Sequence, residues 1–279
     1  MEKNKKLRVF AEEIRVETLK ELAHLGFGHV GGAMSVVETL AVLYGEEMRI
    51  DPSRPQWEER DKLVMSKGHA GPALYATLAL LGYFPKENLL TLNQGGTTLP
   101  SHCDRLKTVG VDMTTGSLGQ GISLACGLAM GNRMLGRDAY TYLIVGDGEC
   151  NEGQIWEGAM FAAQFKLDHL IGFVDLNKQQ LDGKCDDVMY LGDMVDKFTA
   201  FGWNTVKVNG HNVDEIQAAV RAGKATSGKP TMIILDTVKG HGCALAESKF
   251  PNHHIAFTAE EIAPSLVQAE AVLDAARKA

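Results

Sequence analysis

The feature that most constrains the fold is a regular alternation of short apolar runs and amphipathic runs between residues 140 and 237. Alternating strands and helices of this kind form a parallel sheet with helices on both faces. The near-continuous apolar strands also fit a sheet that is buried on both sides. We therefore predict an α/β fold with an open, mostly parallel sheet. In chain order, the expected strands and helices are 140–145, 152–165, 169–176, 194–201, 203–208, 213–223 and 230–237.

The rest of the chain is expected to form helices joined by irregular segments. The run 27–34, "FGHVGGAM", should break the first helix, and 93–121 is a long glycine-rich stretch of the kind that is usually functional or disordered. Thr258 and Glu261 have the spacing of a capping box at the start of the last helix or helix pair. The elements expected here are helices at 1–25, 35–48, 72–84, 122–135 and 258–279 and a strand entering a turn at 62–71.

Composition excludes several classes of protein. The net charge of -7 argues against nucleic acid as the main partner, because phosphate backbones attract basic surfaces. Five cysteines without metal-ligand spacing favour reduced thiols, and hence a cytoplasmic protein. The charged start is unlike a signal peptide, and no apolar run reaches membrane-spanning length. Without a repeat or clear linker, we expect a single domain over residues 1–279.

The stretch 146–153, "GDGECNEG", places a carboxylate where an apolar strand meets a helix. Ligands of parallel sheets bind beyond the carboxyl ends of the strands, and Gly146 and Gly148 allow a sharp turn there. The N-terminus of the following helix would suit phosphate. Asp147 would repel phosphate unless it held a divalent cation such as Mg²⁺. The alternative is an ordinary turn, because Asp-Gly is a common turn dipeptide.

The next strand favours the metal interpretation. Asn177 lies 30 residues after Asp147, one helix and one strand later. Adjacent parallel strands would bring both loops to the same edge of the sheet. Asn177 offers a neutral oxygen ligand, and the irregular "NKQQ" run could offer a backbone carbonyl. The other interpretation of Asn177 is a turn residue at the end of a strand.

Together, "GDGECNEG" and "DLNKQQLDG" resemble the thiamine diphosphate motif of GDG followed by Asn. Further segments resemble transketolase in family order: "GHVGGAMS", "SKGHAGPALY", "TTGSLGQG", and "VKGHG" followed by "NHH". The resemblance runs over residues 24–254. It covers only the half of a standard transketolase that binds the cofactor diphosphate. This implies the first, N-terminal subunit of a split transketolase.

The resemblance also implies a cofactor site. Asp147, the Asn177 side chain and the Gln179 carbonyl would ligate Mg²⁺, and the Gly148 N–H would contact the diphosphate. Lys239 would approach the diphosphate region, although a solvated lysine at a strand end is the alternative. In the glycine-rich segment, the backbone of Gly116, Ser117 and Leu118 would lie along the two cofactor rings. Ser117 stands where the family usually has proline.

Four of the nine histidines stand in matching segments and would surround the reacting carbon and the substrate. His69 would approach the diphosphate and substrate, while His29 and His253 would bind donor oxygens. His102 would bind the C1 hydroxyl, although its segment departs from the family pattern. Such rings are expected to titrate near pH 7. His253 is preferred over the adjacent histidine for its 14-residue spacing from Lys239. Structural or surface roles are expected for His24, His169, His211 and His241.

Two acidic residues and one substitution complete the implied site. Glu152 and Glu157 match positions of a carboxylate chain between the two active sites of a dimer. Their other interpretation is acids favoured by a helix N-terminus. Val30 replaces a usual proline, which could reshape the substrate entrance away from the ordinary pentose phosphate substrates.

The implied reaction is transfer of a two-carbon ketol unit from a ketose or ketose phosphate to an aldose. The glutamate that activates the cofactor lies in the half missing here. We therefore expect the chain to be inactive alone and to need a second subunit carrying the pyrimidine-binding and C-terminal domains, in an α₂β₂ heterotetramer. Two alternatives are the α subunit of a 2-oxo acid dehydrogenase and a noncatalytic Mg²⁺–diphosphate-binding module. Phosphorylated, sulfonated and branched sugars all remain open.

Overall fold

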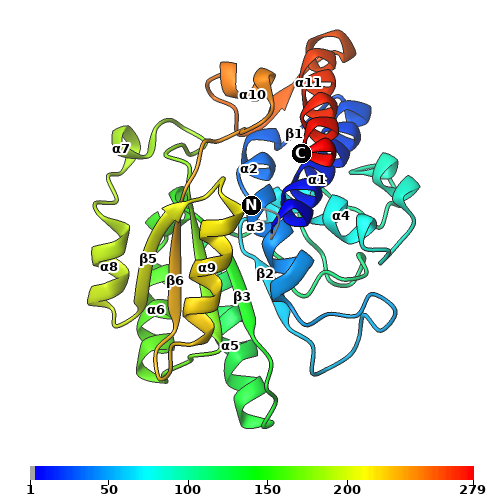
Figure 1. The fold of residues 1–279 in the computed structure, drawn as a ribbon. Coiled ribbons are helices and arrows are strands. Elements are labelled where there is room, and N and C mark those ends of the chain that lie inside the picture. The colour runs from blue at the N-terminus through cyan, green and yellow to red at the C-terminus, as the bar shows by residue number, and fades with distance from the viewer. Residues whose placement is uncertain (1–3) are drawn as a thin grey trace.

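A computed structural model describes residues 4–279 and contains a five-stranded sheet (Figure 1). Its strands are β2 (Lys62–Met65), β3 (Thr141–Gly146), β4 (Leu170–Leu176), β5 (Asn204–Asn209) and β6 (Thr231–Asp236). The order across the sheet is β2-β3-β4-β6-β5, and every pairing is parallel. The predicted open parallel sheet is confirmed.

Each face of the sheet buries its own apolar cluster. Along β3, Tyr142 and Ile144 enter one cluster while Leu143 and Val145 enter the other, because successive side chains of a strand point to opposite faces. The central strands therefore need a helical layer on both sides. The first face is covered by α3 (Val37–Val42) and α9 (Val213–Lys224); the second by α5 (Gly121–Met134), α6 (Gly153–Gln164) and α8 (Met194–Ala200).

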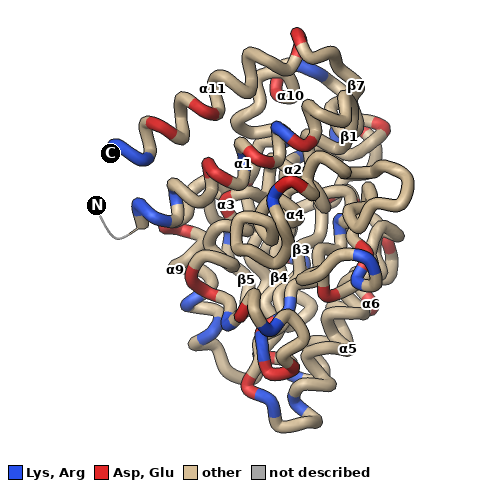
Figure 2. Tube along the Cα trace, turned by 90° about the vertical axis from the view of Figure 1, so that its right-hand side faces the viewer, with Lys and Arg blue, Asp and Glu red and all other residues tan. Residues whose placement is uncertain are grey.

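A group of longer helices extends the first layer beyond β2. Helix α1 (Lys5–Leu25) packs against α4 (Gly71–Leu80) and runs beside α11 (Ala259–Lys278). Figure 2 shows charges of both signs along α1 and α11. The ion pair Lys20–Glu270 joins the two helices at 3.1 Å. The predicted capping box at Thr258 and Glu261 is present, and α11 is a single helix.

The expected break after the first helix is confirmed, because α1 ends at Leu25. After Gly28 the chain forms a short helix, α2 (Val30–Met34), and the helix expected at 35–48 is divided into α3 and a π-helical turn at Leu43–Glu47. The glycines of α2 allow close packing. A Cβ on Gly31 would lie 2.6 Å from the Asn252 carbonyl oxygen, and one on Gly32 would lie 2.8 Å from the His69 ring.

Several short elements were not expected from the sequence. Strand β1 (Phe27–Gly28) pairs antiparallel with β7 (Ile255–Ala256). The remaining bounds differ from the predicted ones by a few residues, and residues 1–3 of the first expected helix lie outside the described part. No helix within 4–279 is long and apolar enough to cross a membrane. The other short helices are Gly68–Ala70, Lys86–Thr91, Gly148–Asn151, α7 (Cys185–Val188) and α10 (Ala244–Ser248).

Candidate active site

The loops after β3 and β4 meet at the carboxyl edge of the sheet, as predicted. Asp147 follows β3, and Asn177 follows β4, its neighbour in the sheet. The two loops are bonded to each other, because the Lys178 N–H donates to the Asp147 carboxylate and the Asp147 N–H donates to the Asp175 carbonyl at 3.1 Å. The parallel register therefore holds the proposed metal-ligating residues together.

Asp147 is a buried carboxylate, only 1% exposed. Its Oδ1 accepts a hydrogen bond from the Gly148 N–H at 2.7 Å. Burial, followed by the nearby charge of Asp175, raises the pKa of Asp147 to about 6. The ionised form is thus costly here unless a cation lies beside it.

The other two predicted ligand oxygens lie in the same loop. The Asn177 amide donates through Nδ2 to Asp175 at 2.8 Å, and its Oδ1 accepts from the Gln179 N–H at 3.1 Å. The Gln179 carbonyl accepts from the Lys239 ammonium at 2.9 Å. The Asp175 contact fixes which end of the Asn177 amide is oxygen.

A buried ion pair beneath this loop was missed by the sequence reasoning. Lys67 and Asp175 are 1% and 0% exposed, and the Lys67 ammonium donates to the Asp175 carboxylate. The same carboxylate accepts from the hydroxyls of Ser35 and Thr237. Burial would raise the pKa of Asp175, but Lys67 and these hydroxyls lower it. Asp175 therefore stays ionised and orients Asn177; its place in "FVDLN" and that of lysine in "SKGH" were the available signals.

The glycine-rich segment crosses the carboxyl end of β2. Thr115 anchors it, donating through its N–H to the Cys103 carbonyl at 3.0 Å and through its hydroxyl to the Met65 carbonyl at 2.7 Å. Gly116 follows with φ +139°, and a Cβ there would lie 3.2 Å from the His102 ring. Ser117 and Leu118 are exposed. The segment thus passes beside His102, and its contact with the cofactor rings stays a prediction.

Glu149 lies within "GDGECNEG", and no role was predicted for it from the sequence. It is 2% exposed and accepts hydrogen bonds from the Ser66 hydroxyl, the Gly119 N–H at 2.9 Å and the Gly146 N–H at 3.0 Å. Burial raises its pKa, and these hydrogen bonds oppose the rise. Glu149 joins the ends of β2 and β3 to the glycine-rich segment.

The four predicted histidines converge beside this edge. The His29 ring centroid lies 5.5 Å from that of His69, 5.3 Å from that of His102 and 5.3 Å from that of His253. The rings of His69 and His253 are 4.6 Å apart. A fifth ring, His254, lies 4.8 Å from His29. The β1·β7 pairing accounts for this, because the pairing of Gly28 with Ile255 brings the adjacent histidines together.

The expectation that these rings titrate near pH 7 is wrong, because the pKa values of all four are lowered. Burial, with neighbouring histidines and Lys239, lowers the pKa of His29 to about 3. Burial, followed by Lys239, lowers the pKa of His253 to about 4. The pKa values of His69 and His102 are also lowered, chiefly by burial. All four imidazoles are therefore neutral at pH 7.

Lys239 connects the predicted metal loop to the histidine cluster. It is 3% exposed, and its ammonium contacts His253 Nδ1 at 3.3 Å as well as the Gln179 carbonyl. Burial, followed by the charge of Lys67, lowers its pKa to about 8. The alternative of a solvated lysine is wrong.

The acidic residues on α6 lie apart from this buried cluster. Glu152 and Glu157 are exposed. Glu152 is the N-cap of α6 and lies beside Gly119, where a Cβ would approach the Glu152 Cβ to 2.7 Å. A short 3₁₀ turn at Gly148–Asn151 separates Asp147 from α6. The N–H groups nearest Asp147 therefore belong to this turn and to the β4 loop, which corrects the expectation of a helix N-terminus there.

Comparison with known proteins shows the family to which the chain belongs. A family profile described as "Transketolase, thiamine diphosphate binding domain" matches residues 7–269. The chain belongs to the transketolase family. Over 250 residues it is 55% identical to the 6-deoxy-6-sulfo-D-fructose transketolase subunit SqwG of Clostridium sp. (strain MSTE9), a match covering 90% of this chain and 91% of that protein. It is 40% identical over 234 residues to an apulose-4-phosphate transketolase subunit of Phocaeicola vulgatus, covering 84% and 83%.

Solved transketolases share the fold but are longer. The transketolase of Campylobacter jejuni matches with a TM-score of 0.87 and 28% identity, over 97% of this chain but 45% of that one. A Pichia stipitis transketolase complexed with sedoheptulose 7-phosphate matches with a TM-score of 0.86 and 28% identity, over 98% and 45%. The chain thus spans less than half of these transketolases, whereas relatives of similar length are named as subunits. The alternative of a 2-oxo acid dehydrogenase subunit is wrong.

The residues present fit the transketolase cofactor. Asp147, Asn177 and Gln179 present carboxylate, amide and carbonyl oxygens, which are ligand types that Mg²⁺ prefers. Beside them, the Gln180 amide nitrogen is buried without a hydrogen-bond partner among residues 4–279. A Cβ on Gly148 would lie 2.7 Å from the Gln180 Cβ and 3.2 Å from its Oε1, so this side chain lies beside Gly148. The buried Lys67 and Lys239 add positive charge.

Proposed function

We propose that this chain is the diphosphate-binding subunit of a two-chain transketolase that uses thiamine diphosphate and Mg²⁺. The observation that carries the proposal is the shared sheet edge, where the Asp147 and Asn177 loops are bonded together beside the histidine cluster. In this proposal, Asp147, Asn177 and the Gln179 carbonyl hold Mg²⁺. The Gly148 N–H and Lys239 bind the diphosphate.

The histidines would handle the sugar. When bound, thiamine diphosphate supplies the carbon centre that carries the two-carbon unit between sugars. His29 and His253, neutral at pH 7, would hydrogen-bond the carbonyl and hydroxyl oxygens of the donor. His102 would bind the C1 hydroxyl, and His69 would contact both diphosphate and substrate. The Gly116–Leu118 backbone would line the cofactor rings.

The partner is proposed from chain length and from the surface. The chain spans less than half of solved transketolases, so a second subunit would supply the pyrimidine-binding and C-terminal domains. On α6, Glu157, Met160 and Phe161 are exposed together at helical spacing. We assign this face, with Glu152, to the assembly interface of an α₂β₂ heterotetramer. We further propose that the chain is a single domain and acts in the cytoplasm.

We propose a sulfonated ketose as the donor. The support is the 55% identity to a 6-deoxy-6-sulfo-D-fructose transketolase subunit, compared with 40% for the relative named for apulose 4-phosphate. Val30, in place of the usual proline, lies at the start of α2 directly after His29, and its side chain is buried in the apolar core. The substrate proposal therefore rests on the relatives and not on this residue.

The test is a ketol-transfer assay of this chain mixed with its partner subunit, which is sought by co-purification and by the genes beside its own. Each reaction contains an aldose acceptor and either 6-deoxy-6-sulfo-D-fructose or fructose 6-phosphate. We expect higher kcat/KM for the sulfonated donor and loss of turnover when EDTA removes Mg²⁺. Preference for the phosphorylated donor would contradict the substrate proposal. Cofactor and Mg²⁺ binding without transfer to any aldose would support the noncatalytic alternative.

A further inference from the structure

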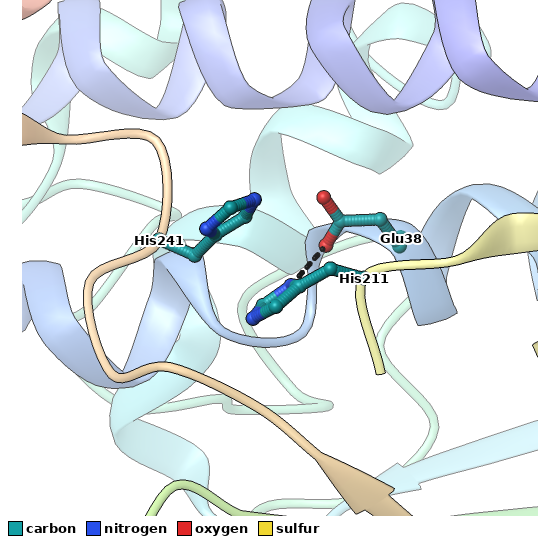
Figure 3. A group of neighbouring side chains, drawn as sticks. All are labelled: Glu38, His211 and His241. Atoms are coloured by element: carbon teal, nitrogen blue, oxygen red, sulfur yellow. Dashed lines mark hydrogen bonds and ion pairs between the residues drawn. The ribbon is translucent and has the colours of Figure 1, made fainter. Parts of the chain in front are cut away.

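A second polar cluster lies on the far side of the segment that carries Lys239. Figure 3 shows Glu38 of α3 with His211 and His241, which come from two different loops. His211 Nδ1 lies 3.3 Å from Glu38 Oε2, and the two imidazole rings are stacked with centroids 3.8 Å apart. Glu38 is 5% exposed. None of these residues belongs to the proposed cofactor site.

The hydrogen bonds determine which nitrogen of His211 carries the proton. The Val238 N–H donates to His211 Nε2 at 2.9 Å, so Nε2 must present its lone pair. Nδ1 then carries the proton and donates it to Glu38. Burial alone would raise the pKa of Glu38, but Arg15 and His211 lower it to about 2, so Glu38 is an ionised acceptor.

These contacts make a metal ion a poor occupant. A transition metal needs a lone pair on an imidazole nitrogen. In His211 one nitrogen accepts from Val238 and the other is protonated toward Glu38. The Arg15 guanidinium, 2% exposed, already binds Glu38 as the positive charge of the cluster.

The cluster instead holds the backbone of residues 238–242, here called the Lys239 turn. His211 accepts from the N–H of Val238, and Arg15 donates to the carbonyl of His241. Gly242, with φ +79°, closes the turn over Arg15, and a Cβ there would lie 2.6 Å from the Arg15 Cδ. Both ends of the turn are thus anchored on the face opposite the cofactor site.

The other side of the same turn faces the cofactor site. The Gly240 N–H donates to the Gly31 carbonyl at 3.0 Å, and Asn252 donates to the Lys239 carbonyl at 3.1 Å. From this turn the Lys239 side chain reaches the Gln179 carbonyl at 2.9 Å. Val238, which His211 holds, directly precedes Lys239 in the chain.

We propose that His211, oriented by Glu38, is a positioning residue that fixes the Lys239 turn and so places the Lys239 ammonium for the cofactor diphosphate. The inference rests on the proposed function, because it assigns Lys239 to the diphosphate. It differs from a purely structural role in one respect. The effect of losing the Val238–His211 hydrogen bond on diphosphate affinity must pass through Lys239.

Substitutions of His211 separate its two contacts. His211→Asn places an amide near the position of Nδ1, so it keeps the contact with Glu38 but is too short to reach Val238. His211→Gln reaches the position of Nε2 and can accept from the Val238 N–H. His241→Ala removes the stacked ring without removing that hydrogen bond, and serves as the matched control. Each variant is made in the full chain, alone and with Lys239→Met.

Calorimetric titration with thiamine diphosphate in saturating Mg²⁺ gives the Kd, and thermal melts report the fold. We expect His211→Asn to raise Kd about tenfold, which is the lower end of the range of affinity losses when a residue that orients a ligand-binding group is substituted. His211→Gln and His241→Ala should stay within about twofold of wild type. With Lys239→Met present, His211→Asn should change Kd no further, because both changes act through one ammonium group.

Three results would overturn the inference. One is an unchanged Kd in His211→Asn while the wild type binds normally. Another is the same loss of affinity with and without Lys239→Met, which would mean that His211 acts elsewhere. The third is stoichiometric Zn²⁺ binding that His211→Gln abolishes, since the nitrogen assignment would then be wrong. A wild-type chain that binds no cofactor, with or without its partner, would instead contradict the proposed function on which the inference rests.

Discussion

At the residue scale, the Asp147 carboxylate experiences two opposing effects: burial disfavours its charge, and neighbouring N–H groups stabilise it. Burial and Asp175 raise its pKa to about 6, while the N–H groups of Gly148 and Lys178 stabilise the carboxylate. For an acid whose folded pKa is raised, the stability contribution is complete below the unfolded pKa of 3.8 and is lost as pH rises through about 6. At pH 7 the carboxylate therefore destabilises the chain, and a bound cation would relieve this.

Asp147→Asn should abolish the thermal stabilisation by thiamine diphosphate and Mg²⁺. A ligand at about 100 times its Kd stabilises the wild type by about 2.7 kcal/mol, which is a Tm rise of several degrees for a chain of this size. The variant loses the charged ligand for Mg²⁺, so its melt should not respond. The exposed Asp186→Asn serves as the control and should respond like the wild type. An undiminished Tm shift in Asp147→Asn would refute its assignment as the metal ligand.

At the element scale, buried ion pairs link the helices and loops around the sheet. Lys67 follows β2 and Asp175 is the penultimate residue of β4, where its carboxylate also accepts from the Asn177 amide. Arg15 of α1 and Glu38 of α3 form a second pair behind the Lys239 turn. Such pairs add little net stability when complete, but leaving one charge alone in the interior is costly.

Asp175→Asn should therefore destabilise the chain by about 3–5 kcal/mol in urea denaturation, because it leaves the Lys67 ammonium buried without its carboxylate. The double variant Lys67→Met with Asp175→Asn should recover part of this loss. Lys20→Met, which breaks the exposed pair with Glu270, is the control and should cost less than about 1 kcal/mol. A double variant as unstable as the sum of the two single ones would show that the pair is not coupled.

The Arg15–Glu38 pair predicts a pH dependence. The pKa of Glu38 is lowered from 4.5 to about 2, so its contribution is present above pH 4.5 and is lost as pH falls toward about 2. Glu38→Gln should therefore be less stable at pH 7 and should show a shallower loss of stability between pH 4.5 and 3 in urea titrations. An equal loss of stability between pH 4.5 and 3 in the variant and the wild type would contradict the ionised state of Glu38.

At the scale of the whole molecule, the sequence predicted what depends on local pattern and on topology. The apolar runs located the strands, and the rule for parallel neighbours placed Asp147 beside the loop of Asn177. The helix through Gly31 and Gly32 was missed, because it depends on close packing against Asn252 and His69, which are distant in the chain. The site roles themselves were read from the resemblance, and they remain predictions.

The remaining differences also come from long-range contacts. The pairing of Lys67 with Asp175 joins residues 108 apart, so their places in "SKGH" and "FVDLN" did not by themselves indicate that the two side chains meet. The neutral state of His29 results from burial among other histidines and Lys239, which a motif alone does not reveal. Tertiary environment therefore set the charges of the candidate site, whereas the sequence had indicated its residue types.

If this chain holds one half of a shared active site, turnover depends on a second subunit, and a complementation assay measures that dependence. Ketol transfer from 6-deoxy-6-sulfo-D-fructose is measured at constant total protein while the ratio of this chain to its partner subunit is varied, with saturating thiamine diphosphate and Mg²⁺. We expect no turnover from either chain alone and a maximum at equimolar amounts. Full turnover by this chain without a partner would contradict the shared active site.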